Sequence, residues 1–360
     1  MPEARVIPLH GPNGATSGAA SGAGAADNGV GRSGPRRPTV INGVAPDATA
    51  LTRPEQAPSK QAPSKPTSSR PTPVADPAAP ADWERTVAGA LSFLRRRITG
   101  DYPVDEFGFD QELTDNVLLP ALRPLFSTWF RVETIGMHHV PADGAALIVA
   151  NHSGTVPVDS MMTALAVHDH HPANRHLRML GADLVFQLPF VGSLARKSGQ
   201  TLACNPDAER LLGAGELVGV WPEGFKGVGK PFKDRYKLQR FGRGGFVSAA
   251  LRTGTPIIPC SIVGAEEIYP LIGNIKPLAR LLGAPYFPVT PFFPLLGPLG
   301  AVPLPSKWYI EFGEPISTVE HGAAAADDPM LVFNLSDQVR ETIQQTLYRL
   351  LSQRRGVFDL

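Results

Sequence analysis

The 360-residue chain is poor in cysteine, has almost no net charge and lacks a long apolar run. Its two cysteines, Cys204 and Cys260, lie far apart, which excludes a disulfide scaffold and a cysteine-rich zinc site and fits a reducing cytosol. Lys and Arg number 34 against 33 Asp and Glu, so no global field favours nucleic acid. No run reaches the ~18 apolar residues of a spanning helix, and the N-terminus has no signal-peptide core. We expect a cytoplasmic protein whose membrane contact is peripheral.

Residues 1–80 contain no aromatic residue and hold 14 of the 37 prolines. Alanine, glycine, serine and threonine fill most other positions, and Ala-Pro-Ser-Lys occurs at both 57–60 and 62–65. Such a composition cannot bury enough apolar surface to offset the entropy lost on ordering. The sequence therefore predicts a disordered tail over 1–80, either a solvated linker or, through its scattered Lys and Arg, a contact with anionic lipid.

Residues 81–132 are predicted to be a helical segment. Apolar residues recur at helical spacing in its first half: Val87, Leu91, Leu94 and Ile98. The arginines at 95–97 that follow suit a helix dipole as well as they suit lipid phosphates. A second helical stretch over 115–130 is rich in Leu, Phe and Trp and is interrupted by Pro120 and Pro124. Packing in the core and apposition to a membrane are both open for this segment.

Residues 133–355 show strand patterns that alternate with helix patterns. The predicted strands are 145–150, 177–181, 217–221, 256–263 and 308–312. The predicted helices are 157–168, 208–212, 245–253 and 335–351. This alternation predicts an α/β domain with a largely parallel central sheet flanked by helices.

The first candidate site follows the predicted strand 145–150. Asn151 and His152 come directly after the strand, and Asp159 lies early in the next helix. Strand ends in α/β sheets are where sites are built. A histidine held by a carboxylate at one ring nitrogen can act as a base through the other nitrogen. The alternative is an Asn-His turn that only caps the helix.

The second candidate site follows the predicted strand 217–221 through a Pro-Glu-Gly turn. Seven Lys and Arg against one Asp lie between residues 225 and 243, among them Lys226, Lys230 and Arg243. Lysines beside loop glycines suit a phosphate group. The alternative is an ordinary solvated run of charge.

Three blocks in this order carry a family resemblance: Asn151-His152 with Asp159, Trp-Pro-Glu-Gly at 221–224, and Pro-Ile-Ile-Pro at 256–259. They resemble the blocks of the phospholipid and glycerol acyltransferase superfamily over roughly residues 130–320. The resemblance implies an O-acyltransferase of lipid metabolism that needs no bound cofactor or metal. It implies an acyl thioester donor (acyl-CoA or acyl carrier protein), a glycerolipid hydroxyl as acceptor, and attachment to a membrane face, here the inner face of the cell membrane.

The resemblance also implies residue roles. His152 is the expected general base and Asp159 its orienting partner. The expected substrate-binding residues are Asn151, Glu223, Gly224, Lys226, Lys230 and Arg243. The oligomeric state is left open.

The blocks depart from the common pattern in three ways. Six residues separate the His from the Asp, where four are usual, which resembles the mono- and diacylglycerol acyltransferase-like variant. Phe225 and Lys226 replace the usual Thr-Arg, and no Asp-Arg pair follows Gly199. A CoA-independent phospholipid transacylase and a lipid-binding member without turnover are the alternatives, and the six-residue gap is the main argument for the second.

Two other stretches stand out. A cluster with the composition of metal ligands, His168, Asp169, His170, His171 and His176, follows a predicted helix, and a solvated loop is expected there. Residues 281–305 are apolar but contain seven prolines, which forbids a spanning helix. We expect this stretch to line an acyl groove or touch the membrane interface, with core packing as the alternative.

Overall fold

The computed structural model describes residues 5–7, 82–153, 156–242, 244–283 and 285–358. Its centre is a seven-stranded sheet with the order β3 (Glu133–Ile135), β11 (Tyr309–Phe312), β8 (Ile257–Val263), β4 (Ala146–Ala150), β7 (Leu217–Val220), β5 (Leu177–Gly181) and β6 (Thr201–Leu202). Every neighbouring pair is parallel except β8 with β11. The predicted α/β fold with a largely parallel sheet is confirmed.

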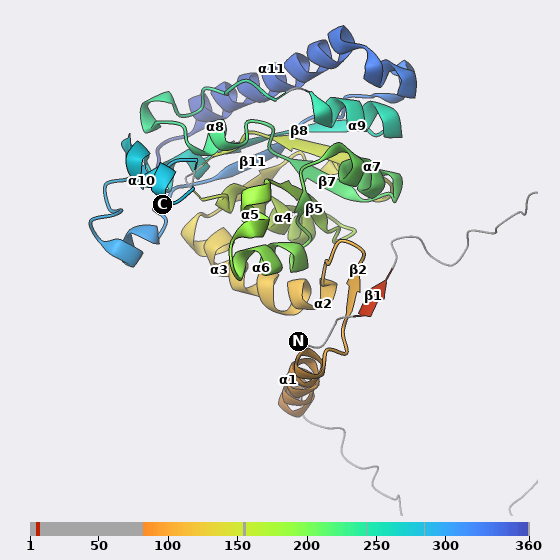
Figure 1. The fold of residues 1–360 in the computed structure, drawn as a ribbon, viewed down its shortest axis with the longest axis vertical. Helices are drawn as coiled ribbons and strands as arrows, with labels where there is room; N and C mark the ends of the chain where they lie inside the picture. Colours follow the sequence, from red (N-terminus) through yellow and green to blue (C-terminus); the bar gives the residue numbers. More distant parts are fainter. Residues whose placement is uncertain (1–4, 8–81, 154–155, 243, 284, 359–360) are drawn as a thin grey trace, which may run out of the picture. The chain divides into compact units, whose positions relative to one another are not determined.

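Helices cover both faces of the sheet. One face carries α7 (Asn205–Gly213), α9 (Gly245–Thr253) and α11 (Pro329–Gln353), and the other carries α4 (Val158–His170) (Figure 1). Alternation along β4 explains this, because Leu147 and Val149 pack with the first group while Ile148 packs with α4. All five residues of β4 are buried, as expected for a central strand of a parallel sheet.

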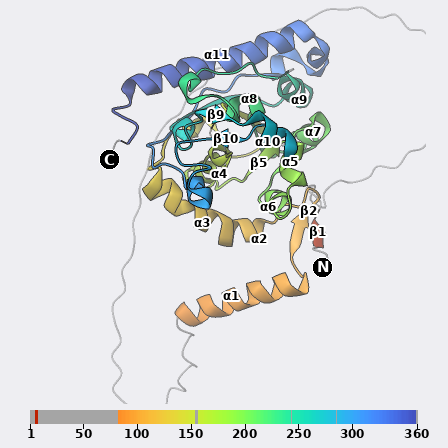
Figure 2. The ribbon, with the colours of Figure 1, turned by 60° about the vertical axis from the view of Figure 1, so that its left-hand side comes forward.

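The segment 111–129 is a continuous helical run with two wide turns. It consists of α2 (Gln111–Leu113), a π-helical turn (Thr114–Leu118), α3 (Leu119–Pro124) and a second π-helical turn (Leu125–Trp129). Proline cannot donate to the preceding turn and crowds its carbonyl, and the first wide turn, which ends two residues before Pro120, relieves that clash. Figure 2 shows α2 and α3 on the side of the sheet opposite α9 and α11.

The N-terminal part of the chain contributes α1 (Asp82–Thr99) and a small sheet in which β1 (Arg5–Ile7) pairs in parallel with β2 (Pro103–Asp105). β1 departs from the predicted tail at these three residues, because β2 offers an unpaired strand edge. The remaining tail residues, 1–4 and 8–80, lie outside the described residues. None of the described helices is both long and apolar enough to cross a membrane.

Short elements complete the described chain. The helices are α5 (Asp183–Gln187), α6 (Val191–Lys197), α8 (Phe225–Val228) and α10 (Lys276–Leu281), and a hairpin joins β9 (Gly273–Asn274) to β10 (Pro288–Val289). Single 3₁₀ turns occur at Met137–His139, Phe232–Asp234, Ala265–Glu267, Gly297–Ala301, Val319–His321 and Ala323–Asp327. The predicted apolar stretch 281–305 therefore forms turns and a two-residue strand.

Candidate active site

Two neighbouring parallel strands end side by side at the site. β4 pairs with β7 from Ala146 opposite Leu217 to Val149 opposite Val220. His152 follows β4 by two residues and Glu223 follows β7 by three. The carboxyl ends of parallel strands therefore bring the two sequence motifs together, 71 positions apart in the chain.

Asn151 is fully buried and fixes the end of β4. Its side-chain oxygen accepts from the backbone N–H of Ile262 at 2.7 Å, and its amide nitrogen donates to the carbonyl of the same residue at 3.0 Å. The side-chain amide of Asn151 thus continues the hydrogen bonding between β4 and β8 just beyond the end of β4. These bonds let Asn151 support the loop that carries His152, and the substrate contact expected for Asn151 from the sequence stays a prediction.

His152 and Asp159 form a close pair. The ring Nδ1 of His152 lies 2.8 Å from Oδ2 of Asp159, and the Asp159 carboxylate is fully buried. Asp159 sits in the first turn of α4, which begins at Val158 just after Pro157. Its oxygens also accept from the backbone N–H groups of Ser153 and Ser160, both at 2.9 Å. The six-residue gap therefore does not separate the histidine from its carboxylate.

The electrostatics of this pair favour the imidazolium. Burial by itself lowers the pKa of His152, but the charge and hydrogen bond of Asp159 and the charge of Glu223 outweigh burial, so the pKa is raised above 6.5. The side chain of His152 is 14% exposed. The ring can therefore accept a proton and hold it, and part of its side chain remains accessible from solvent.

Glu223 ties the two loops together. One carboxylate oxygen accepts from the backbone N–H of His152 at 3.0 Å, and the other accepts from the N–H of Gln239 at 2.6 Å. The residue is 3% exposed. Gly224 follows with φ of +54°, a value that favours glycine, and allows the chain to turn into α8. Both residues shape the loop around His152.

Lys230 points inward. Its ammonium lies 3.1 Å from Glu266 and 3.4 Å from Glu223, and its side chain is 2% exposed. Burial raises the pKa of Glu266 to about 7, against the charge of Lys230, which lowers it. The two carboxylates are in position to neutralise the ammonium, and the substrate contact expected for Lys230 from the sequence stays a prediction. Sequence inspection missed Glu266, whose one signal is an acidic pair that begins three residues after the end of β8.

Gly227 is a second residue that the sequence inspection missed. A Cβ on Gly227 would lie 2.7 Å from the carbonyl oxygen of His152 and 2.8 Å from the Cβ of Glu223. Only glycine allows α8 to approach His152 this closely. The signal in the sequence was a second glycine three residues after Gly224.

Lys226 and Arg243 are the remaining candidates from the sequence. Lys226 is exposed in α8, and its ammonium makes no ion pair with any residue of the described ranges. Arg243 lies outside the described residues. Tyr286, from the apolar stretch 281–305, has its ring close to Gly229, and burial followed by the charge of Asp159 raises its pKa to about 12. This apolar stretch therefore borders the site.

Comparisons with known proteins identify relatives of the chain. Residues 131–263 match the family described as Acyltransferase. An uncharacterised protein of Mycobacterium tuberculosis H37Rv is 62% identical over 281 residues, 78% of each chain. A human protein named "DGAT1/2-independent enzyme synthesizing storage lipids" is 24% identical over 190 residues, 53% of this chain and 55% of the relative.

Among solved structures, the 1-acyl-sn-glycerophosphate acyltransferase of Thermotoga maritima aligns with a TM-score of 0.45 and 17% identity, covering 75% of this chain and 91% of that one. The matched residues 131–263 contain β4, α4, β7 and β8, and with them the His152–Asp159 pair and the Trp-Pro-Glu-Gly turn. The chain belongs to the phospholipid and glycerol acyltransferase superfamily.

Proposed function

We propose that the protein is an O-acyltransferase that moves a fatty acyl group from acyl-CoA or acyl carrier protein to a hydroxyl of a glycerolipid. The observation that carries the proposal is the 2.8 Å contact between the His152 ring and the buried carboxylate of Asp159 at the end of a central strand. That arrangement supplies a base with a defined tautomer and a carboxylate that stabilises the protonated ring.

The chemistry needs no covalent acyl-enzyme. With its proton on Nδ1 facing Asp159, His152 takes the proton of the acceptor hydroxyl on Nε2 while the hydroxyl oxygen attacks the thioester carbonyl carbon. The tetrahedral intermediate collapses, the C–S bond breaks, and the departing thiolate takes the proton back from the imidazolium. The products are an ester and a free thiol, and His152 returns to its starting form.

Replacing His152 tests the proposal. His152→Ala should lower kcat by ~10²–10⁴, the usual contribution of a general base, while the fold is kept. The measurement is transfer from labelled long-chain acyl-CoA to a panel of lysophospholipids and mono- and diacylglycerols, with circular dichroism to verify folding. The exposed histidine variant His138→Ala is the matched control and should keep full activity. Retention of most activity by folded His152→Ala would refute the proposed base.

Two features point to different classes of acceptor. The exposed Lys226 supports a substrate that carries phosphate, whereas the name of the human relative supports a neutral glycerolipid. Running the assay with a labelled phospholipid donor and no acyl-CoA tests the alternative of a CoA-independent transacylase. The close contact of His152 with Asp159 argues against a member without turnover, because the six-residue gap leaves the pair assembled.

Contact with a membrane surface is the second part of the proposal. Large apolar side chains of the stretch 281–305, which brings Tyr286 to the site, are exposed to solvent: Leu281, Leu282, Phe292, Leu295, Leu296 and Leu299. A cluster of exposed apolar residues beside a lipid-modifying site suits docking on the headgroup region of a bilayer. We place the enzyme peripherally on the inner face of the cell membrane, where its acceptor would lie.

A further inference from the structure

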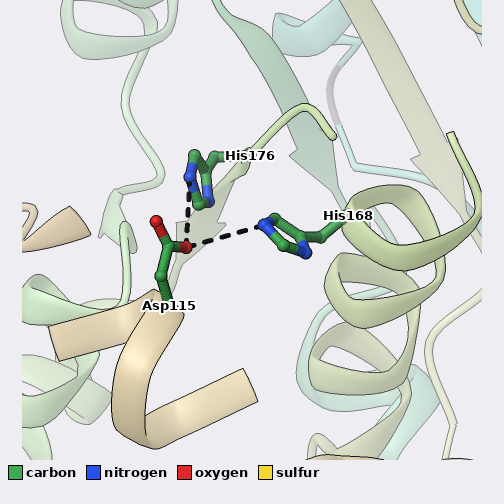
Figure 3. Close-up of side chains that lie close together, drawn as sticks. All are labelled: Asp115, His168 and His176. Carbon is green, nitrogen blue, oxygen red and sulfur yellow. Dashed lines mark ion pairs between the residues drawn. The ribbon is translucent and has the colours of Figure 1, made fainter. Parts of the chain in front are cut away.

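Of the four histidines between residues 168 and 176, two have partners of their own. The His171 ring Nε2 lies 3.0 Å from the carbonyl of Val140, and the ring of His170 stacks on Phe126 at 5.4 Å. His168 and His176 differ, because both rings turn toward the carboxylate of Asp115 (Figure 3). The sequence predicted a solvated loop here, but His168 lies inside α4 and both rings are more than four-fifths buried.

The distances in this cluster match a metal site. Oδ1 of Asp115 lies 3.6 Å from Nε2 of His168 and 3.4 Å from Nε2 of His176. Two ligand atoms that each stand ~2.0–2.2 Å from a tetrahedral zinc ion are roughly 3.3–3.5 Å apart. All three ligand atoms lie within 4.8 Å of one another. One ion can therefore be reached by all three with small side-chain movements.

Oδ1 of Asp115 is a buried oxygen without a hydrogen-bond donor among the described residues. Such an atom normally costs free energy unless a donor or a cation satisfies it. The nearby guanidinium of Arg178 is paired with Asp105 at 2.6 Å, which offsets its repulsion of a cation.

His168 also has the outer partner that metal-bound histidines usually have. Its Nδ1 lies 2.9 Å from Oδ1 of Asp169. Asp169 is held in turn by Arg123, whose Nε donates at 2.7 Å and whose second nitrogen donates at 3.0 Å. A carboxylate behind the ring directs Nε2 toward the ion and strengthens it as a ligand.

We propose that Asp115, His168 and His176 bind one divalent zinc-type ion, with water completing the coordination. The ion would join three segments: the helical run 111–129, the last turn of α4, and the chain just before β5. His168 lies about 14 Å along α4 from Asp159, at about 1.5 Å per residue, so this ion would not touch the reacting atoms. The site would be structural, holding the helical run against the helix that carries Asp159.

Zinc and cobalt binding test the proposal. Untagged full-length protein, stripped with EDTA and titrated with Zn²⁺, should bind one ion per chain and show a higher Tm. Co²⁺ should give the visible absorption bands of a low-symmetry four-coordinate site. His168→Gln, His176→Gln and Asp115→Asn should each abolish stoichiometric binding, and Asp169→Asn should weaken it about 10–100-fold. His170→Gln is the matched control and should bind as the parent protein does.

The titration of the unmodified protein decides the case even if a variant does not fold. Absence of stoichiometric Zn²⁺ binding together with a Co²⁺ spectrum of the hydrated ion would overturn the proposal. Binding that His170→Gln abolishes, while His168→Gln and His176→Gln keep it, would overturn it as well. Because the proposed site is structural, a variant that loses zinc and keeps its His152-dependent activity agrees with the proposal. The outcome of the zinc titration is therefore independent of the proposed acyltransferase function.

Discussion

The carboxylate of Asp159 is fully buried. Two backbone N–H groups and the His152 ring surround its oxygens, and the residue sits in the first turn of α4, where the helix dipole favours a negative charge. These donors satisfy the carboxylate oxygens in place of water. The carboxylate can therefore set the tautomer and the pKa of His152 at the same time.

The pH dependence follows from the raised pKa of His152. The base works when neutral, so kcat/KM should rise with pH and level off above a midpoint that lies above 6.5. Asp159→Asn removes the largest contribution that raises this pKa, so its midpoint should move to lower pH while the plateau rate falls. An unchanged midpoint in kcat/KM profiles of the two proteins would contradict the pairing.

The raised pKa of His152 also predicts that the stability of the fold falls as pH rises, whereas the activity rises. A folded-state pKa above the unfolded value stabilises the fold fully below the unfolded pKa, and this contribution is lost as pH rises through the folded pKa. Tm measured across the titration range of histidine should include this fall, and His152→Ala should remove it. Activity therefore rises over the interval in which this contribution to stability declines.

Lys226 is the residue on which the phosphate question turns. If its exposed ammonium contacts a substrate phosphate, Lys226→Gln should raise KM for that substrate more than it lowers kcat, and added salt should raise KM for the parent enzyme. Lys237→Gln is a matched control, because Lys237 belongs to the same basic run but is 67% exposed and ion-paired with Asp234. Unchanged kinetic constants in Lys226→Gln would favour a neutral acceptor.

At the scale of elements, α8 packs against the backbone of His152 and helps to fix its position. It is four residues long, and its packing depends on the absence of a side chain at Gly227, where the backbone of His152 passes. Lys230, just after α8, binds Glu223 and Glu266 and so fastens this helix to the turn after β8. The position of His152 therefore depends on contacts made by two other loops.

Gly227→Ala should displace His152 or α8. The added methyl group would clash with the backbone, so we expect a loss of about 1–3 kcal/mol in stability and a fall of up to about 10²-fold in kcat/KM. Gly213→Ala is the matched control, since a Cβ there meets no atom within 4 Å, and it should leave both quantities nearly unchanged. Thermal melts and the acyl transfer assay give the comparison, and equal behaviour of the two variants would show that the close approach is unimportant.

At the scale of the whole molecule, the helical run 111–129 and the residue after it contribute side chains to the core. Leu119, Phe126 and Phe130 are buried in the same cluster as the apolar side of α4. This packing answers the question that the sequence left open for this stretch. Leu94 and Ile98 of α1 are exposed, by contrast, and suit the membrane contact proposed above. The predicted domain boundaries at 80 and 132 stay predictions.

The sequence by itself determined the α/β class, most strands of the central sheet and the candidate pair His152 and Asp159. The predicted strand 177–181 and helix 245–253 coincide with β5 and α9, because apolar periodicity and flanking glycines reflect local backbone preferences. His152 and Asp159 were visible because both lie within nine residues of the end of one strand. Their roles as base and orienting partner stay predictions until the variants are measured.

Only the tertiary structure decided which polar residues turn inward. Lys230 and Lys226 are four positions apart in one basic run, yet one is buried between carboxylates and the other is exposed. Asp115 meets His168 and His176 from 53 and 61 positions away in the chain. The reason is physical: burial and convergence depend on how distant segments pack, and composition or spacing along the chain contains no record of that packing.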